Sequence, residues 1–357
     1  MLMVTQAVDL DDPVLGFTHT WVNALARRVE VLHVVTLVAG RHYLADNVVL
    51  HAYGPPGKPH NRSNRFWFYN RYFSHLVLGR RVNVIFVHMI PRWVLLATPY
   101  AKVRRVPVVL WYTHRAVSWQ LRLAHWLADW VVTASRESYG LLDEKVTILG
   151  HGIDTEYFHP VPREPDGFFR VLSVGRLSPV KQHEVLIEAA RILVQERGMD
   201  NLRVRIVGGP ARPGDEEYAY TLRQAVANHG LESHFTFVGA VPYVKVVHQY
   251  QECDLFVNLS RTDSLDKAVL EAMACGVPVV TSNPAFGPLL AEVKGRLLVP
   301  HGDAKALAEA MAGVARLSLP QRQALGQTLR ERVEREHSVD RLIEQLMYVF
   351  EQVLPRT

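Results

Sequence analysis

Residues 263–280 read DSLDKAVLEAMACGVPVV. The pattern predicts a loop, a helix, a turn at Cys275-Gly276 and a buried strand. Asp263 lies in the loop, and Glu271 follows eight residues later, in the first turns of the helix. A helix N-terminus suits an anionic ligand because its N–H groups are free and its dipole is positive there. A carboxylate inside the helix can reach past phosphates to a sugar hydroxyl. The stretch therefore indicates a nucleotide-sugar site, the alternative being an ordinary helix that enters a buried strand.

A second motif lies upstream, where residues 171–181 read VLSVGRLSPVK. We expect an apolar strand to end at Gly175, with Arg176 and Lys181 following across a turn. Arg can grip two oxygens with its planar fork and Lys acts as a point charge, while glycine permits close backbone approach. Two cations at the carboxyl end of a buried strand therefore suit a diphosphate, whereas either cation alone is usually a solvated surface charge.

Together these motifs resemble the family 4 retaining glycosyltransferases. The resemblance rests on GRL at 175–177 with Lys181, on EAMACGVP at 271–278, and on HGID at 151–154 with Phe158 and Pro160, which is similar to the family's interdomain signature. It implies an α/β protein of the GT-B architecture, in which two doubly wound, Rossmann-like domains face a cleft. It also implies that ligands bind where the carboxyl ends of the strands meet that cleft.

The resemblance implies roles for the residues on the donor side. Arg176 and Lys181 would hold the donor diphosphate and neutralise charge on the leaving group, so that no metal is required. Glu271 would accept hydrogen bonds from the ribose hydroxyls. Asp263 falls where the family usually has Glu, in contact with the transferred sugar, and Asp is one methylene shorter.

The loop that follows Asp263 departs from the family's common Gly-Phe-Gly and reads Ser264-Leu265-Asp266, then Lys267. We interpret it as a variant whose backbone N–H groups, at residues 264–267, serve the phosphates. Asp266 is either the helix N-cap or a ligand contact. We interpret Lys267 as a solvated side chain, with added charge at the diphosphate as the alternative.

Three further positions complete the donor side. Gly175 permits close backbone approach, and Gly208 ends a strand and leaves space near the nucleotide. The base would lie near Val238–Val241, read by backbone groups around Val241. The sequence does not separate uracil, guanine and adenine at this position, and the donor is expected to be UDP- or GDP-linked.

On the acceptor side, the resemblance assigns His114, after the strand VVLWYT, to a position beside the transferred sugar. His88 closes another strand that faces the same cleft. A histidine there can donate to a sugar hydroxyl or steer developing charge, and the alternative for each is a structural residue.

The first loop, DLDDPVLGF at 9–17, holds only Gly16 where the family usually has a Gly-rich turn, and Phe17 follows it. Both are assigned to the acceptor side. Asp11 and Asp12 would repel a diphosphate, so they contact the acceptor or are plain loop residues.

Residues 58–81 mix five arginines with six Phe, Trp and Tyr residues. On a helix this pattern is typical of a segment that contacts an anionic membrane surface, or of a core helix with a solvated basic face. A third use is to grip a lipid-phosphate or acidic saccharide acceptor.

At 357 residues the chain is long enough for two domains. We expect an acceptor-side domain over residues 1–160 and a nucleotide-sugar-binding domain over residues 161–338, with a final helix within 339–357 that packs back on the first domain. Apolar runs alternate with amphipathic stretches in both, which is typical of parallel sheets covered by helices. The predicted strands are 31–38, 82–88, 106–112, 130–134, 170–174, 203–207, 235–238, 255–259, 277–281 and 296–299, and the predicted helices are 18–28, 63–78, 118–127, 183–196, 216–228, 244–252, 267–274 and 339–354.

Charge and cysteine content limit the partners and the compartment. Residues 1–160 contain 17 Lys plus Arg and 11 Asp plus Glu, against a net charge of +5 for the whole chain, so the first half suits an anionic partner. No nucleic-acid motif is evident.

Cys253 and Cys275 are expected to be small buried side chains in a reduced compartment. No signal peptide or spanning segment of about 20 apolar residues is visible, so we expect a cytoplasmic protein, peripheral at most to the inner face of the cytoplasmic membrane.

The sequence therefore predicts a hexosyltransferase, and the resemblance to family 4 implies that it is a retaining one. It would move sugar from a nucleoside-diphosphate-sugar to a hydroxyl acceptor, which is a glycan, a lipid-linked compound or a small molecule. One alternative is a non-catalytic GT-B protein that binds carbohydrate or another subunit, which the altered loop favours. The other is a sugar-nucleotide epimerase.

Overall fold

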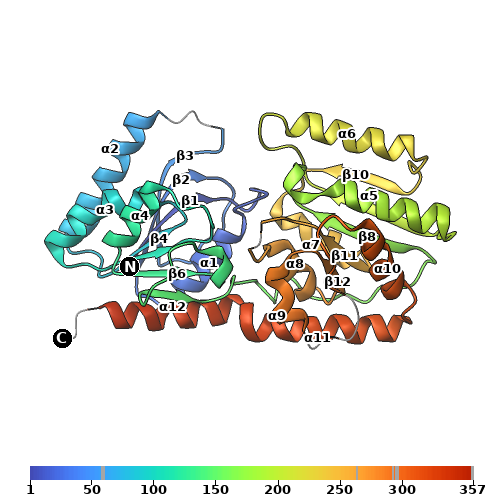
Figure 1. Ribbon diagram of the computed structural model, residues 1–357. Coiled ribbons are helices and arrows are strands. Elements are labelled where there is room, and N and C mark those ends of the chain that lie inside the picture. The colour runs from blue at the N-terminus through green and yellow to red at the C-terminus, as the bar shows by residue number, and fades with distance from the viewer. Residues whose placement is uncertain (58–60, 263, 292, 294–296, 355–357) are drawn as a thin grey trace. The chain divides into compact units, whose positions relative to one another are not determined.

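The computed structural model describes residues 1–57, 61–262, 264–291, 293 and 297–354 of the chain (Figure 1). The chain divides into two compact units. Unit 1 comprises Met1–Gly152, Pro242–Val244 and Ser338–Thr357, and unit 2 comprises Ile153–Val241 and Lys245–His337. The first crossing falls inside the HGID motif, between Gly152 and Ile153.

Unit 1 is built on a seven-stranded parallel sheet in the order β3-β2-β1-β4-β5-β6-β7. Its strands are β1 Leu2–Val8, β2 Leu32–Ala39, β3 Val48–Gly54, β4 Ile85–His88, β5 Val108–Trp111, β6 Trp130–Thr133 and β7 Val146–Ile148. Its helices are α1 Phe17–Ala26, α2 Arg62–Phe73, which continues as a π-helical turn over Ser74–Leu78, α3 Pro91–Arg104, α4 Trp119–Leu127 and α12 Val339–Val353.

Helices cover both faces of this sheet because its strands are apolar on both sides. In β4, Phe86 joins a core that includes Trp21 of α1 and Phe350 of α12. Its neighbours Ile85 and Val87 join the opposite core, beneath α2, α3 and α4. Alternate residues of β4 thus contribute to two hydrophobic cores, one on each face of the sheet.

Unit 2 is built on a five-stranded parallel sheet in the order β10-β9-β8-β11-β12. Its strands are β8 Phe169–Val174, β9 Leu202–Val207, β10 Phe235–Gly239, β11 Leu255–Asn258 and β12 Val279–Thr281. The helices that follow in this part of the chain are α5 His183–Arg191, with a π-helical turn over Ile192–Glu196, α6 Asp215–Asn228, α7 Tyr243–Gln251, α8 Lys267–Ala274, α9 Gly287–Leu290, α10 Ala304–Ala315 and α11 Leu319–His337.

The predicted fold class, α/β with two doubly wound parallel sheets, is confirmed. The predicted elements are present with small changes at their ends, except the last strand. There, residues 297–299 make only an isolated bridge to Thr281, and residues 294–296 lie outside the described part. The structure adds the strands β1, β3 and β7 and the helices α3, α9, α10 and α11, which the sequence pattern did not predict.

Two expectations about composition can be compared with the structure. Cys275 is buried, but Cys253 is only half-buried, and both thiols are free. Among the described residues, no helix has the length and apolar character needed to cross a bilayer.

Candidate functional site

The candidate donor residues gather at one edge of the unit 2 sheet. All five strands are parallel, so their carboxyl ends meet there. Strand β8 leads into Gly175 and Arg176, β9 leads into Gly208, and β10 leads to Val241. Strand β11 leads into the loop before α8, which carries Glu271. This edge is the natural position for a ligand in a doubly wound sheet.

Close approach of two loops shapes this edge. A Cβ atom on Gly208 would lie 1.8 Å from the carbonyl oxygen of Gly175, and Gly208 has φ +139°. The Gly175 N–H donates to the Val207 carbonyl at 2.9 Å, and the Leu177 N–H donates to the Gly209 carbonyl at 3.1 Å. Glycine at position 208 is therefore a steric requirement of this loop arrangement.

The two predicted diphosphate cations differ in their surroundings. Arg176 is half-buried, and its side chain makes no hydrogen bond or ion pair with the described residues. Lys181 lies against Gly175, where an added Cβ would meet its Cε at 3.1 Å, and its ammonium pairs with the Asp266 carboxylate. The loop thus presents one free guanidinium and one ammonium that is already neutralised.

Asp266 links the loop to helix α8. Its carboxylate caps the helix by accepting from the Ala268 N–H at 3.3 Å, and it also accepts from the Asn258 amide at 3.0 Å and from Lys181. Burial acts to raise the pKa of Asp266, but the charge of Lys181 and these hydrogen bonds bring it below its usual value. Of the two predicted roles, the N-cap is confirmed.

Glu271 lies on the buried side of α8, and only 5% of the residue is exposed. Its carboxylate accepts from the hydroxyl of Tyr250 at 2.9 Å, and Tyr250 is itself fully buried. Burial, together with the charge of Glu271, raises the pKa of Tyr250 well above its ordinary value. The Tyr250 hydroxyl therefore helps to fix the orientation of the Glu271 carboxylate.

Lys267 corrects one interpretation made from the sequence. Its ammonium group is buried, so it is not a solvated cation. Burial lowers the pKa of Lys267 to about 7, and the charge of Glu271 acts in the opposite direction. A group with this pKa gains its proton readily when an anion binds beside it.

We expect Lys267→Met to stabilise the ligand-free protein at pH 7 and to lose that advantage as the pH rises. In the unfolded chain a lysine titrates near pH 10.4, so between about pH 7 and 10 the unfolded state holds a proton that the folded state releases. The wild-type free energy of unfolding therefore rises over this window, relative to the variant. Urea unfolding of both proteins at pH 7, 8.5 and 10 measures the difference, and a constant difference would contradict this account.

The other donor-side predictions occupy the same edge. The Ser264 carbonyl accepts from the Asn283 amide at 2.7 Å, and the Leu265 side chain is buried. Val241 is half-buried, two residues beyond β10. Asp263, predicted to contact the transferred sugar, lies outside the described residues.

The two predicted acceptor-side histidines lie at neighbouring strand ends of unit 1. His88 ends β4 and is 1% exposed. Its Nδ1 lies 3.0 Å from the Thr5 hydroxyl, and its ring packs against Phe17 and Trp21. His114, three residues beyond β5, is exposed. Of the two imidazoles, only that of His114 is therefore open to solvent.

The first loop of unit 1 is held by its own carboxylates. Asp11 forms an ion pair with Arg41 at 2.7 Å, and the Asp12 carboxylate accepts two backbone N–H groups at 2.8 Å each. Gly16 occupies the N-cap position of α1, and Phe17 begins the helix, half-buried. Of the two uses predicted for Asp11 and Asp12, these contacts favour the role of loop residues.

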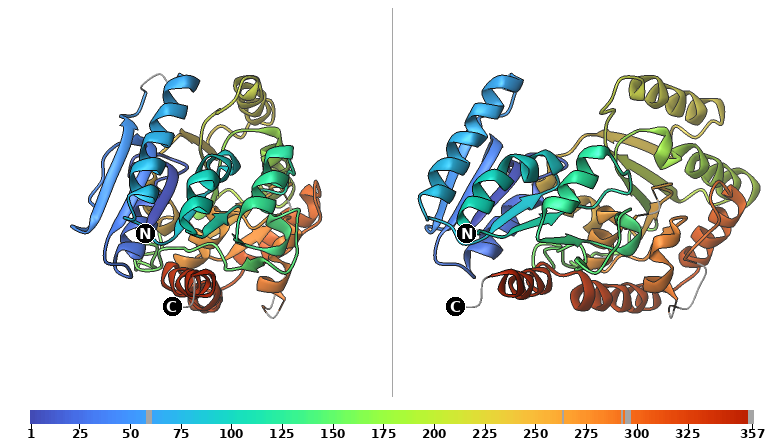
Figure 2. Two further views of the ribbon diagram at one scale, coloured as in Figure 1. Left: turned by 90° about the vertical axis from the view of Figure 1, so that its left-hand side faces the viewer. Right: turned by 60° about the vertical axis from the view of Figure 1, so that its left-hand side comes forward.

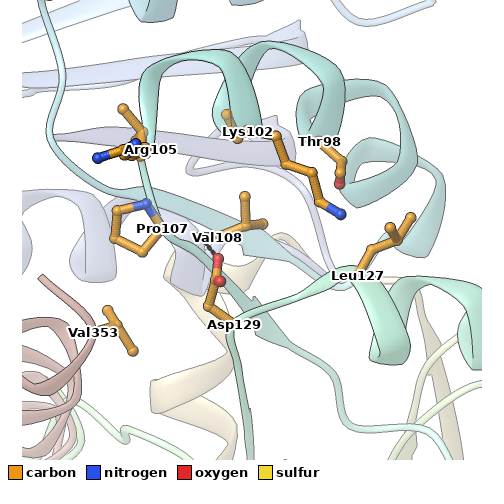
Figure 3. A pocket seen from close by; sticks show the side chains of 10 residues that line it. Thr98, Lys102, Arg105, Pro107, Val108, Leu127, Asp129 and Val353 are labelled. Carbon is orange, nitrogen blue, oxygen red and sulfur yellow. Dashed lines mark hydrogen bonds between the residues drawn. The ribbon is translucent and has the colours of Figure 1, made fainter. Parts of the chain in front are cut away.

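Unit 1 also contains pockets. One of about 610 Å³ lies near the carboxyl ends of β1, β2 and β4, and its lining includes Gln6, Leu37, Ile90, Arg92 and Trp119. Figure 3 shows another, of about 420 Å³, at the amino ends of β5 and β6. In that pocket the Val108 N–H donates to the Asp129 carboxylate at 2.7 Å. The pocket of about 610 Å³ lies at the carboxyl edge of the sheet, which is also the edge that carries His88 and His114.

Sequence reasoning missed the side chains that orient the candidate site. Tyr250 and Asn258 carry no motif, and their role depends on long-range packing. Among the described residues there is no group of three or more His, Cys, Asp or Glu side chains arranged to hold a metal ion.

Known proteins resemble the chain in fold and in sequence. The HepE protein of Anabaena, in its crystal structure with UDP and glucose, superposes with a TM-score of 0.74 at 16% identity, covering 98% of each chain. The amylovoran biosynthesis glycosyltransferase AmsK of Erwinia amylovora is 37% identical over 174 residues, covering 46% of this chain and 40% of AmsK. D-inositol 3-phosphate glycosyltransferase 2 of Catenulispora acidiphila is 30% identical over 198 residues, covering 52% and 45%. The chain thus spans about half the length of the curated relatives it matches.

Two doubly wound parallel sheets with this topology define a protein of the GT-B fold. The family model for glycosyl transferases group 1 matches residues 154–332, and the chain belongs to that family. The resemblance to family 4-like glycosyltransferases stated from the sequence is confirmed.

Proposed function

We propose that the protein is a retaining glycosyltransferase that moves a sugar from a UDP- or GDP-linked donor to a hydroxyl acceptor. The observation that carries the proposal is the grouping of Arg176, Lys181 and Glu271 at the carboxyl edge of the unit 2 sheet. Family membership supports it, as do the glycosyltransferase activities for which the relatives are named. The UDP bound to HepE supports a uridine nucleotide as the first donor to test.

The donor diphosphate would meet two cations in different states. The Arg176 guanidinium has no competing contact among the described residues, so it can form a bidentate pair with phosphate oxygens at once. The Lys181 ammonium would either leave the Asp266 carboxylate for a phosphate oxygen or contact both groups at once. Glu271, oriented by Tyr250, would accept from the ribose hydroxyls.

In the proposed transfer the bond between the anomeric carbon and the leaving phosphate oxygen breaks. A bond to the acceptor oxygen forms on the same face of the sugar. The acceptor proton passes to the leaving phosphate, so no enzyme nucleophile is needed. Arg176 and Lys181 would stabilise the negative charge that develops on the leaving diphosphate. These two cations would take the place of a metal ion in that step.

The acceptor would be bound by residues 1–160, with the helix in 339–357 attached to that domain, and the donor by residues 161–338. His114 is exposed at a strand end and would donate to a hydroxyl of the transferred sugar. The pocket of about 610 Å³ has the volume of a small-molecule site and would take part of the acceptor. Segment 58–81 supports an acceptor that is linked to lipid phosphate at an anionic membrane.

A donor-turnover assay tests this proposal. Purified protein would be supplied with UDP-glucose or a GDP-sugar and candidate acceptors, and the product examined by proton NMR. We expect an anomeric configuration equal to that of the donor and a rate unchanged by EDTA. An inverted product would contradict retention, and loss of activity that is restored by Mg²⁺ would contradict metal independence.

A further inference from the structure

A long stretch of unit 1 contains no acidic residue. Residues 47–128 include twelve Lys and Arg and no Asp or Glu. At the chain's average of 35 acidic residues in 357, a stretch of this length would hold about eight. Helices α2, α3 and α4 all lie within it, and they stand side by side on one face of the unit 1 sheet (Figure 2). The three helices therefore present a surface with positive charge alone.

Helix α4 carries apolar side chains on its solvent side. Trp119 is 69% exposed, Leu123 39% and Trp126 70%. These positions are spaced i, i+4 and i+7, so they form one stripe along the helix. The opposite side, with Leu121 and Ala124, is fully buried in the core. Packing within unit 1 thus explains the buried side and leaves the exposed stripe for a partner.

The neighbouring helices extend this surface. On α2, Trp67 is 68% exposed and Phe66 46%, and on α3, Val103 is 73% exposed. The Lys102 ammonium lies 5.6 Å from the centre of the Trp126 ring, so cation and indole share one patch. Among the side chains that the structure describes on this surface, the exposed cations are Arg71, Arg92, Lys102, Arg105 and Arg122.

The larger unit 1 pocket opens within this surface. Its lining includes Phe66 from α2, Trp93 from α3 and Trp119 from α4, together with the guanidinium-bearing residues Arg65 and Arg92. An apolar recess with cations at its wall fits a molecule that joins a hydrocarbon chain to an anionic group.

We propose that the exposed face of α2, α3 and α4 docks on an anionic lipid bilayer. Tryptophan is the side chain that favours the boundary between headgroups and hydrocarbon, and Lys and Arg are attracted to the negative surface potential of anionic lipids. A polyanion such as nucleic acid would use the cations but not the apolar stripe on α4. A second copy of this face would be repelled, because the surface carries one sign of charge.

This inference deepens the proposed function, since an enzyme docked in this way would act on a lipid-linked acceptor. It also stands apart from it, because lipid binding needs neither donor nor transfer. Failure of donor turnover and failure of membrane binding are therefore separate results.

Cosedimentation with vesicles tests the proposal. We expect wild-type protein to bind phosphatidylcholine vesicles containing about 30% phosphatidylglycerol at least about tenfold more tightly than pure phosphatidylcholine, and to bind less at about 0.5 M salt. The double variant Trp119→Ser/Trp126→Ser should lose about tenfold in vesicle affinity. A matched control, Tyr220→Ser/Tyr348→Ser, removes two aromatic side chains that are each 63% exposed on α6 and α12, and it should bind as wild type does.

A second variant, Lys102→Gln/Arg122→Gln, keeps the test independent of any folding defect in the tryptophan variant, because both side chains are exposed. It should weaken binding to anionic vesicles and leave the thermal midpoint unchanged. Absence of wild-type binding would overturn the proposal, as would equal binding by the tryptophan variant. Loss in the charge variant alone would also overturn it, in favour of a general polyanion surface.

Discussion

Arg176→Ala is expected to lower the rate of sugar transfer by about 10²–10³-fold, the loss typical for removal of one group that stabilises transition-state charge. The thermal midpoint should stay near that of wild type. The Arg176 side chain is half-buried and makes no polar contact with the described residues, so its removal breaks nothing in the ligand-free protein. Initial rates with a UDP-sugar, together with thermal unfolding, measure both effects.

Lys181→Ala provides the comparison, because that residue is paired before any ligand binds. Its loss should lower transfer and also lower the thermal midpoint, since the half-buried carboxylate of Asp266 would lose its counter-charge. Near-wild-type turnover in Arg176→Ala would contradict the proposal that this loop binds the donor diphosphate. Equal destabilisation by the two variants would contradict the contrast between a free and a paired cation.

Gly208→Ala is expected to lower the free energy of unfolding by about 2–5 kcal/mol, from steric overlap and an unfavourable φ together. Its Cβ would lie 1.8 Å from the Gly175 carbonyl oxygen, and φ is +139°. The chain can relieve the overlap by moving the loop that carries Gly208 or the loop that carries Arg176, and both lie at the candidate donor edge, so donor affinity should fall as well. Urea unfolding and donor titration of the variant measure the two losses.

Gly209→Ala is the matched control one residue away. A Cβ there would meet its nearest neighbour, Ala240, at 3.7 Å, which is ordinary contact. We expect its stability and donor affinity to lie close to those of wild type. If Gly208→Ala were as well tolerated as Gly209→Ala, the close approach of the two loops would not be a feature of the folded protein.

The sequence predicted those parts of the fold that depend on local signals such as helix caps and turns. Helix α8 begins at Lys267 and ends at Ala274 as predicted, because Asp266 caps it and Cys275-Gly276 ends it. By contrast, α3 was not predicted, since it contains Pro99, a residue that usually marks a helix boundary. Strand β1 was not predicted either, because Thr5 and Gln6 interrupt its apolar run.

The candidate site was predictable in its residue types and not in its pairings. Gly175, Arg176 and Lys181 could be expected at a strand end, because an apolar run precedes them. The pairing of Lys181 with Asp266, and of Glu271 with Tyr250, joins residues far apart in the chain. The burial of Lys267 depends on the same tertiary packing, which no local pattern carries.

A calorimetric titration of nucleoside diphosphates tests the central claim most directly. UDP, GDP and ADP would each be titrated into wild-type protein and into Arg176→Ala. We predict that one nucleotide binds wild type with a measurable enthalpy and that its affinity falls at least about tenfold in the variant, the loss of a charge-assisted contact. Absence of binding by all three nucleotides, or equal affinity in the two proteins, would contradict a donor site built on Arg176.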